Sequence, residues 1–140
     1  LDRIYGTRIA LHADDPEAAL HVMEDASASV RGPLETCPGC RITFAVPAAI
    51  AAARAGEIDL AERHEEQCAY LADVVMRLPA WYAAHNEVRG HIAAARGQGG
   101  ADAVSRFGAA ATKFRQAGHP IDAARCERLA ASAATGTIAR

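Results

Sequence analysis

Aromatic residues, lysine and long apolar runs are all scarce in this 140-residue chain. Only 5% of the residues are aromatic, and the fifteen basic residues are fourteen arginines and Lys113, with no block of five or more. The longest apolar run, Phe44 to Ala53, has ten residues and contains Pro47, whereas a membrane-spanning helix needs about 20. With a net charge of −2, the sequence predicts neither a membrane span nor direct nucleic-acid binding.

Alanine is the residue that the chain has in excess, at 35 of the 140 positions. Because alanine is the best helix former and Val, Ile and Thr are scattered, the composition favours closely packed helices over strands. Four cysteines at irregular spacing do not make a disulfide scaffold in a chain of this size, so we expect a reducing, cytoplasmic environment. The chain opens at Leu1 without a secretory signal, and we expect it to be a fragment of a longer protein.

An internal repeat of forty-two residues sets the expected architecture. The segment Ile50-Ala51-Ala52-Ala53-Arg54 recurs unchanged as Ile92-Ala93-Ala94-Ala95-Arg96. Under the same shift three columns align, namely Ala19, Ala61 and Ala103, then Met23, Glu65 and Phe107, then Ala26, Cys68 and Ala110. The two small-residue columns hold in all copies, while the larger-residue column fails at Glu65. Small residues let paired helices approach to the short end of the range of about 8–10 Å between axes.

Start and stop signals divide the chain into helices. Asp15-Pro16, and glycines or prolines at the segment ends, predict helices over 1–11, 16–31, 41–55, 59–78, 81–96, 101–117 and 121–134. We therefore expect an all-α fold, an array of about seven antiparallel helices (an α-α superhelix) whose repeat columns resemble the tetratricopeptide pattern. It forms a single domain, with repeats over 1–36, 37–78 and 79–119 and a capping helix over 120–135.

The helix over 81–96 predicts a binding face. Its apolar stripe consists of Trp81, Ala84, Val88, Ile92 and Ala95. The candidate partner-binding residues lie on another side and are Arg54, Tyr82, Asn86, Arg89 and Arg96, with Arg54 the repeat equivalent of Arg96. Helical solenoids bind partners on such faces, and arginine holds carboxylates. We expect a protein or peptide partner, or a small effector, with acidic groups, and Tyr82 as the hot spot; an ordinary solvated helix surface is the alternative.

Several segments carry a family resemblance. They are Cys37-Pro38-Gly39-Cys40, Pro47-Ala48-Ala49-Ile50 through Ala55-Gly56, Ala61-Glu62, Arg89-Gly90 and Pro120-Ile121-Asp122-Ala123-Ala124-Arg125-Cys126. Together with the repeat columns they resemble tetratricopeptide repeats, and more narrowly the C-terminal helical-repeat region of bacterial ATPase-containing transcriptional regulators of the LuxR type. The resemblance implies a module that senses a signal or binds a partner. The sequence has no phosphate-binding loop, because Lys113 lies outside any such pattern.

Cys37-Pro38-Gly39-Cys40 is the sharpest local motif. Two thiolates at this spacing can hold a zinc ion, and Cys68 and His64 are candidate further ligands. An antiparallel helix pair places Cys40 opposite about residue 73, within reach of Cys68 but not of His64. A zinc sensor, a redox sensor, a thiol enzyme and plain thiols all stay open. Cys68 and Cys126 also fit the role of small buried residues.

No other group of residues forms a catalytic set. The six histidines contain no close metal-binding pair, and we expect most of them to be solvated or capping. We expect Asp14-Asp15 to stabilise a helix start, and Glu24-Asp25 and Glu65-Glu66 to lie on solvated helix faces. The sequence therefore predicts a non-enzymatic protein with no cofactor, the thiol readings at Cys37 and Cys40 being the alternative.

Overall fold

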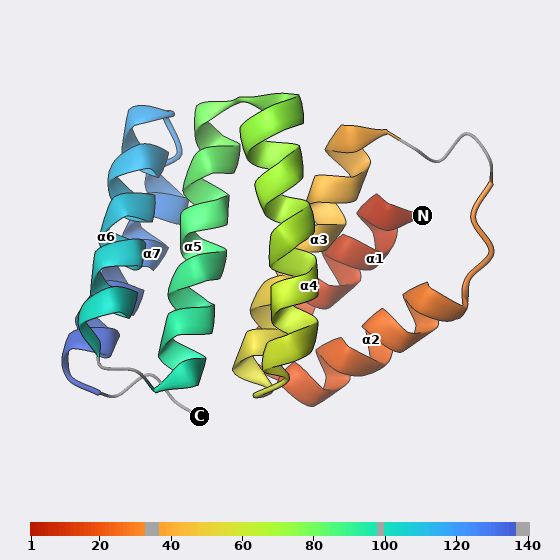
Figure 1. Cartoon of the computed structure of the whole chain (residues 1–140), viewed down its shortest axis with the longest axis horizontal. Coiled ribbons are helices and arrows are strands. Elements are labelled where there is room, and N and C mark those ends of the chain that lie inside the picture. The colour runs from red at the N-terminus through yellow and green to blue at the C-terminus, as the bar shows by residue number, and fades with distance from the viewer. Residues whose placement is uncertain (33–36, 98–99, 137–140) are drawn as a thin grey trace.

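A computed structural model describes residues 1–32, 37–97 and 100–136. Within these ranges the chain forms seven α-helices and one π-helix and has no strand (Figure 1). The elements are α1 (Asp2–Leu11), α2 (Pro16–Ala28), α3 (Pro38–Arg54), α4 (Ile58–Ala69), η1 (Tyr70–Met76), α5 (Pro79–Arg96), α6 (Gly100–Gln116) and α7 (Pro120–Ala134). The predicted all-α class is confirmed. None of these helices combines the length and apolar character needed to cross a membrane.

Proline and glycine set most helix ends, as the sequence predicts. Asp15 caps α2, because its Oδ1 accepts a hydrogen bond from the Ala18 amide at 3.1 Å. Prolines occupy the first position of four helices, where a missing N–H is not needed; these are Pro16, Pro38, Pro79 and Pro120. Glycines with positive φ follow four helices, namely Gly56, Gly97, Gly118 and Gly136.

Three predicted boundaries are wrong. Helix α2 ends at Ala28 rather than Arg31, because Ser29 is already extended; Pro33, the expected stop, lies outside the described residues. Helix α3 begins at Pro38 rather than at 41, so both cysteines of the CxxC motif belong to its start. The predicted helix over 59–78 divides into α4 and the π-helix η1, and Arg77, the residue after η1, lies in the left-handed region, with φ 49°.

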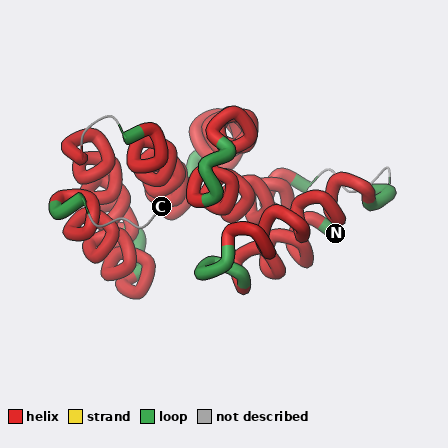
Figure 2. Tube along the Cα trace, turned by 90° about the horizontal axis from the view of Figure 1, so that it is seen from below, coloured by secondary structure: helices red, strands yellow, loops and turns green. Residues whose placement is uncertain are grey.

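The helices pack mostly on their neighbours in sequence. Helix α3 contacts α1, α2, α4 and α5, and α5 contacts α3, α4 and α6, while α7 packs on α6. Figure 1 shows α5 between α4 and α6, and Figure 2 shows the N-terminal and C-terminal helices at opposite ends of the molecule. Since α1, α3 and α5 contact one another in succession, each interior helix is covered on several sides.

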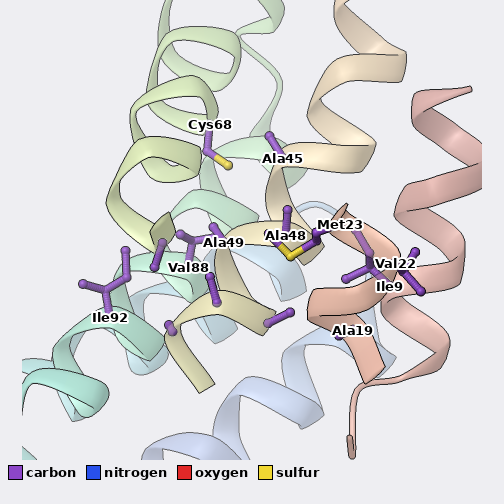
Figure 3. Close-up of a cluster of buried hydrophobic side chains, with 14 residues drawn as sticks. Ile9, Ala19, Val22, Met23, Ala45, Ala48, Ala49, Cys68, Val88 and Ile92 are labelled. Atoms are coloured by element: carbon purple, nitrogen blue, oxygen red, sulfur yellow. The ribbon is translucent and has the colours of Figure 1, made fainter. Parts of the chain in front are cut away.

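The small-residue columns of the repeat form the core. All six members are at most 1% exposed, namely Ala19, Ala61 and Ala103, and Ala26, Cys68 and Ala110. Figure 3 shows Cys68 of α4 facing Ala45 of α3, where a larger side chain would push the two helices apart. The large-residue column is buried at Met23 and Phe107, and Glu65 is half-buried.

Glycines mark close approaches between helices, and Gly6 and Gly90 are two of them. A Cβ added at Gly6 of α1 would lie 2.2 Å from the carbonyl oxygen of Thr43 in α3. One added at Gly90 of α5 would lie 2.6 Å from the Phe107 ring of α6. No real Cβ contact is that short, so α1–α3 and α5–α6 pack closely because these positions have no side chain.

The predicted apolar stripe of α5 is only partly correct. Ala84, Val88 and Ile92 are buried, but Trp81 is half-buried and Ala95 is exposed. Burial extends well beyond a stripe, since His85, Glu87 and His91 are at most 7% exposed. The reason is that α5 packs on α3, α4, η1 and α6 at once, so most of its circumference faces another helix.

Candidate functional site: a charged groove on helix α5

A charged groove of about 260 Å³ lies where α4, α5 and α6 meet. Because α5 lies between the other two helices (Figure 1), it contributes the middle of the groove, and α4 and α6 contribute the sides. The lining residues are Glu62 and Glu65 of α4, Arg89, Ile92, Ala93 and Arg96 of α5, and Asp102 and Arg106 of α6. Six of the eight are charged, and the other two are the apolar Ile92 and Ala93.

The three arginines of the groove are not equivalent. Arg96 pairs with Glu62 across the α4–α5 contact. Arg106 lies 3.5 Å from Asp102 on its own helix. Arg89 is exposed, and among the described residues it has no hydrogen bond or ion pair. Its guanidinium is thus the cation that remains available to a ligand.

Glu65 connects the groove to a buried histidine. Its Oε1 lies 2.5 Å from Nε2 of His85, whose Nδ1 lies 3.5 Å from Oδ2 of Asp73. The hydrogen bond to His85 holds the pKa of Glu65 below its usual value against the opposing effect of burial, and the charges of His85, Arg89 and Arg106 add to the lowering. Glu65 therefore stays ionised at the wall of the groove and fixes the position of His85.

This pair corrects two predictions from sequence. Glu65 does not lie on a solvated face, because it turns inward to His85, and His85 is itself buried at 7% exposure. The repeat contains a signal for this pair, because Glu65 occupies the column that holds Met23 and Phe107 in the other copies. A carboxylate at such a core position needs a polar partner.

Of the other histidines, some are exposed to solvent and some are buried or half-buried. His12, His21 and His119 are exposed, as predicted. His91 is buried, and its ring meets Phe107 edge-on at 5.1 Å between centroids. Burial lowers the pKa of His91 to about 3, and the charges of Arg54 and Arg125 act in the same direction.

The structure brings together only two of the five candidate partner-binding residues in the groove, Arg89 and Arg96. Tyr82 is half-buried and packs on the apolar cluster of Ile42, Leu71 and Ala72. Tyr82 therefore lies in a packed environment rather than beside the two arginines.

The remaining two candidates also lie outside the groove lining. Asn86 uses its Nδ2 to donate to the Tyr82 carbonyl at 2.8 Å, one turn back along α5. Arg54 closes the last turn of α3, where its charge acts on His91. Sequence reasoning missed Arg106 of α6, since the repeat gave no register between α5 and α6.

The candidate zinc ligands are not assembled. Cys68 is fully buried in the alanine core, and burial raises the pKa of its thiol to about 12. The half-buried His64 ring packs edge-on against Phe44 at 5.7 Å between centroids. Across the described ranges, no three His, Cys, Asp or Glu side chains converge on one point that could hold a metal ion.

A second, shallower hollow of about 640 Å³ runs along α6 and α7. Its two main charged residues, Arg115 and Glu127, pair with each other. Both charges are therefore matched within the hollow, whereas the groove holds Arg89, which has no ion-pair partner among the described residues.

Comparison with known proteins adds no relative. No protein-family model, curated protein or solved structure matches the chain. The assignment of a function therefore rests on the groove, the repeat and the residues that line them.

Proposed function

We propose that this chain is a non-enzymatic protein-interaction module, and that the groove of α4, α5 and α6 binds a carboxylate-bearing segment of a protein or peptide partner. The observation that carries the proposal is Arg89, an exposed guanidinium in a preformed groove with no ion-pair partner among the described residues. Arginine presents a planar fork of donors that matches a carboxylate in two hydrogen bonds.

The ion pair beside Arg89 can give up its own carboxylate in favour of one from a ligand. Both partners of Arg96–Glu62 have side chains at least 40% exposed, and an exposed ion pair contributes only about 0–1 kcal/mol. An incoming carboxylate can therefore replace Glu62 on Arg96 at little cost, while Glu65 is retained by His85. The ligand then spans Arg89 and Arg96, which lie two turns apart on one face of α5.

The wider context of the module is part of the same proposal. The forty-two-residue repeat supports a tetratricopeptide-like superhelix, and the quoted segments support a place in a cytoplasmic bacterial transcription regulator of the LuxR type. In such a regulator this segment supplies recognition of a partner, while ATP and DNA are handled by other domains.

Calorimetric titration with a short oligoglutamate peptide, and with its oligoglutamine counterpart, tests the proposal. We expect the glutamate peptide alone to bind, and Arg89→Ala to weaken binding by about 1.5–3 kcal/mol, roughly ten- to hundredfold in Kd. Arg128→Ala is the matched control, since Arg128 is an exposed arginine of α7 outside the groove. Equal binding of both peptides, or equal loss in the two variants, would overturn the proposal.

A further inference from the structure

The Cys37-Pro38-Gly39-Cys40 motif forms the first turn of α3. Cys37 is the N-cap, and its carbonyl accepts the first helical hydrogen bond from the Arg41 amide at 3.0 Å. Cys40 follows three residues later on the same turn. In helical geometry, residues at this spacing have Cα atoms about 5 Å apart, within the range of about 4.4–6.8 Å that a disulfide needs.

The two sulfur atoms lie in unequal surroundings. Cys37 is exposed and Cys40 half-buried. The Cys37 sulfur folds over the turn, since it lies 3.9 Å from the position that a Cβ on Gly39 would take, and the Met76 methyl of η1 lies at the same distance from that position. Because Gly39 has no side chain, the Cys37 sulfur lies next to the backbone of the first turn of α3.

The electrostatics of the turn separate the two thiols further. The amide of Cys40, the thiol of Cys40 and the amide of Gly39 lower the pKa of Cys37, while the neighbouring Cys37 sulfur and burial raise the pKa of Cys40. A thiolate at a helix N-terminus is the reactive form of cysteine. The exposed sulfur is therefore also the one that ionises more readily to the thiolate.

The other two cysteines are buried thiols of low reactivity. Cys68 and Cys126 are both 0% exposed, and burial raises the pKa of each to about 12. The chain therefore contains one accessible pair of thiols and two buried single ones, and the pair is not part of the groove.

We propose that Cys37 and Cys40 form a redox-active dithiol that exchanges with low-molecular-weight disulfides, with Cys37 as the attacking thiol and Cys40 as the resolving thiol. The Cys37 thiolate attacks one sulfur of the disulfide, forming a mixed disulfide and releasing the other sulfur as a thiolate. Cys40 then loses its proton to solvent and attacks the Cys37 sulfur, which releases the second thiolate. The protein dithiol loses two electrons and two protons, and the small disulfide is reduced to two thiols.

The full chain equilibrated in buffers of reduced and oxidised glutathione, quenched and mapped by mass spectrometry, provides the test. We expect one intramolecular disulfide, Cys37–Cys40, that appears and disappears reversibly with the buffer, while Cys68 and Cys126 react only after denaturation. Cys68→Ala is the matched control, because alanine occupies the equivalent repeat positions Ala26 and Ala110, and it should leave the exchange unchanged.

Two single variants separate the roles of the sulfurs. Cys40→Ser should accumulate a mixed disulfide of glutathione with Cys37, and Cys37→Ser should form neither the internal bond nor a rapidly formed mixed disulfide. In the parent, iodoacetamide near pH 7 should label Cys37 before Cys40. A bond between two copies of the chain, participation of Cys68 or Cys126, equal labelling of the pair, or a zinc ion retained on both thiols after purification would each overturn the proposal.

Discussion

Arg125 of α7 holds the buried carboxylate of Glu87 in α5 through two hydrogen bonds, each 2.7 Å long. Glu87 is only 3% exposed, and a third bond of 2.6 Å ties Arg125 to Asp122. Glu87 thereby raises the pKa of the Arg125 guanidinium above its ordinary value. The pair joins two helices that are otherwise connected mainly through α6.

Removal of one partner from this pair should be costly. Arg125→Ala leaves the Glu87 charge buried without a counterion, so we expect the free energy of unfolding to fall by about 3 kcal/mol in urea denaturation. The control is Arg115→Ala, which breaks the exposed Arg115–Glu127 pair and should cost less than about 1 kcal/mol.

Replacing both members of the buried pair tests whether the unpaired charge of Glu87 causes the loss of stability. Glu87→Leu with Arg125→Leu leaves no unpaired charge, so the double variant should be more stable than Arg125→Ala. A double variant as unstable as the single one would show that packing of the Arg125 stem, rather than charge, carries the effect.

His91 should make the fold sensitive to acid. Its folded pKa of about 3 lies below the ordinary value of 6.5, so below pH 6.5 the unfolded chain binds a proton that the folded chain does not. The stability present above pH 6.5 should therefore fall as the pH drops toward 3, by at most about 1.4 kcal/mol per pH unit from this group. His91→Leu should show a flatter dependence of unfolding free energy on pH.

The control for His91 is an exposed histidine. His21 has a side chain that is 79% exposed, and His21→Leu should keep the pH dependence of the parent. The pKa of His64 is also lowered by burial, but it is present in all three proteins and does not enter the difference. An unchanged slope in His91→Leu would contradict the assignment.

Gly90 and Gly108 should respond in opposite ways to alanine. A Cβ at Gly90 would meet the Phe107 ring, so Gly90→Ala should destabilise the fold by about 1–3 kcal/mol despite its better helix propensity. A Cβ added at Gly108 of α6 would meet no other part of the protein within 4 Å beyond its own helix backbone and chain neighbours, and Gly108→Ala should stabilise by up to about 1 kcal/mol. Thermal unfolding of both variants measures this, and a stabilised Gly90→Ala would disprove the close α5–α6 contact.

The positions of most helices could be predicted from the sequence, because helix starts and ends depend on residues that are neighbours along the chain. Pro16 begins α2, and Gly56 and Gly97 follow α3 and α5, since the conformations that these residues favour need no tertiary context. Pro79 and Pro120 were expected to end the preceding helices and instead begin α5 and α7. The repeat also identified the buried columns, because a small residue recurring at one position of each copy marks a contact between helices.

The site was harder to predict because it depends on how helices cross. Arg89 and Arg96 could be placed on one face of α5 from their spacing, but nothing local says that α6 brings Arg106 beside them. Tyr82 was expected on the binding face and instead packs on the cluster of Ile42, Leu71 and Ala72, of which the last two belong to η1. That π-helix has no sequence signature that short-range propensity can detect.

The most direct test of the interaction proposal is a backbone amide NMR titration of the isotope-labelled chain with the oligoglutamate peptide. The account predicts saturable shift changes centred on α5 around Arg89 and on the facing turns of α4 and α6, and their loss in Arg89→Ala. Saturable changes confined to α1 and α2 or to the α6–α7 hollow, or the same map in the Arg89 variant, would contradict it.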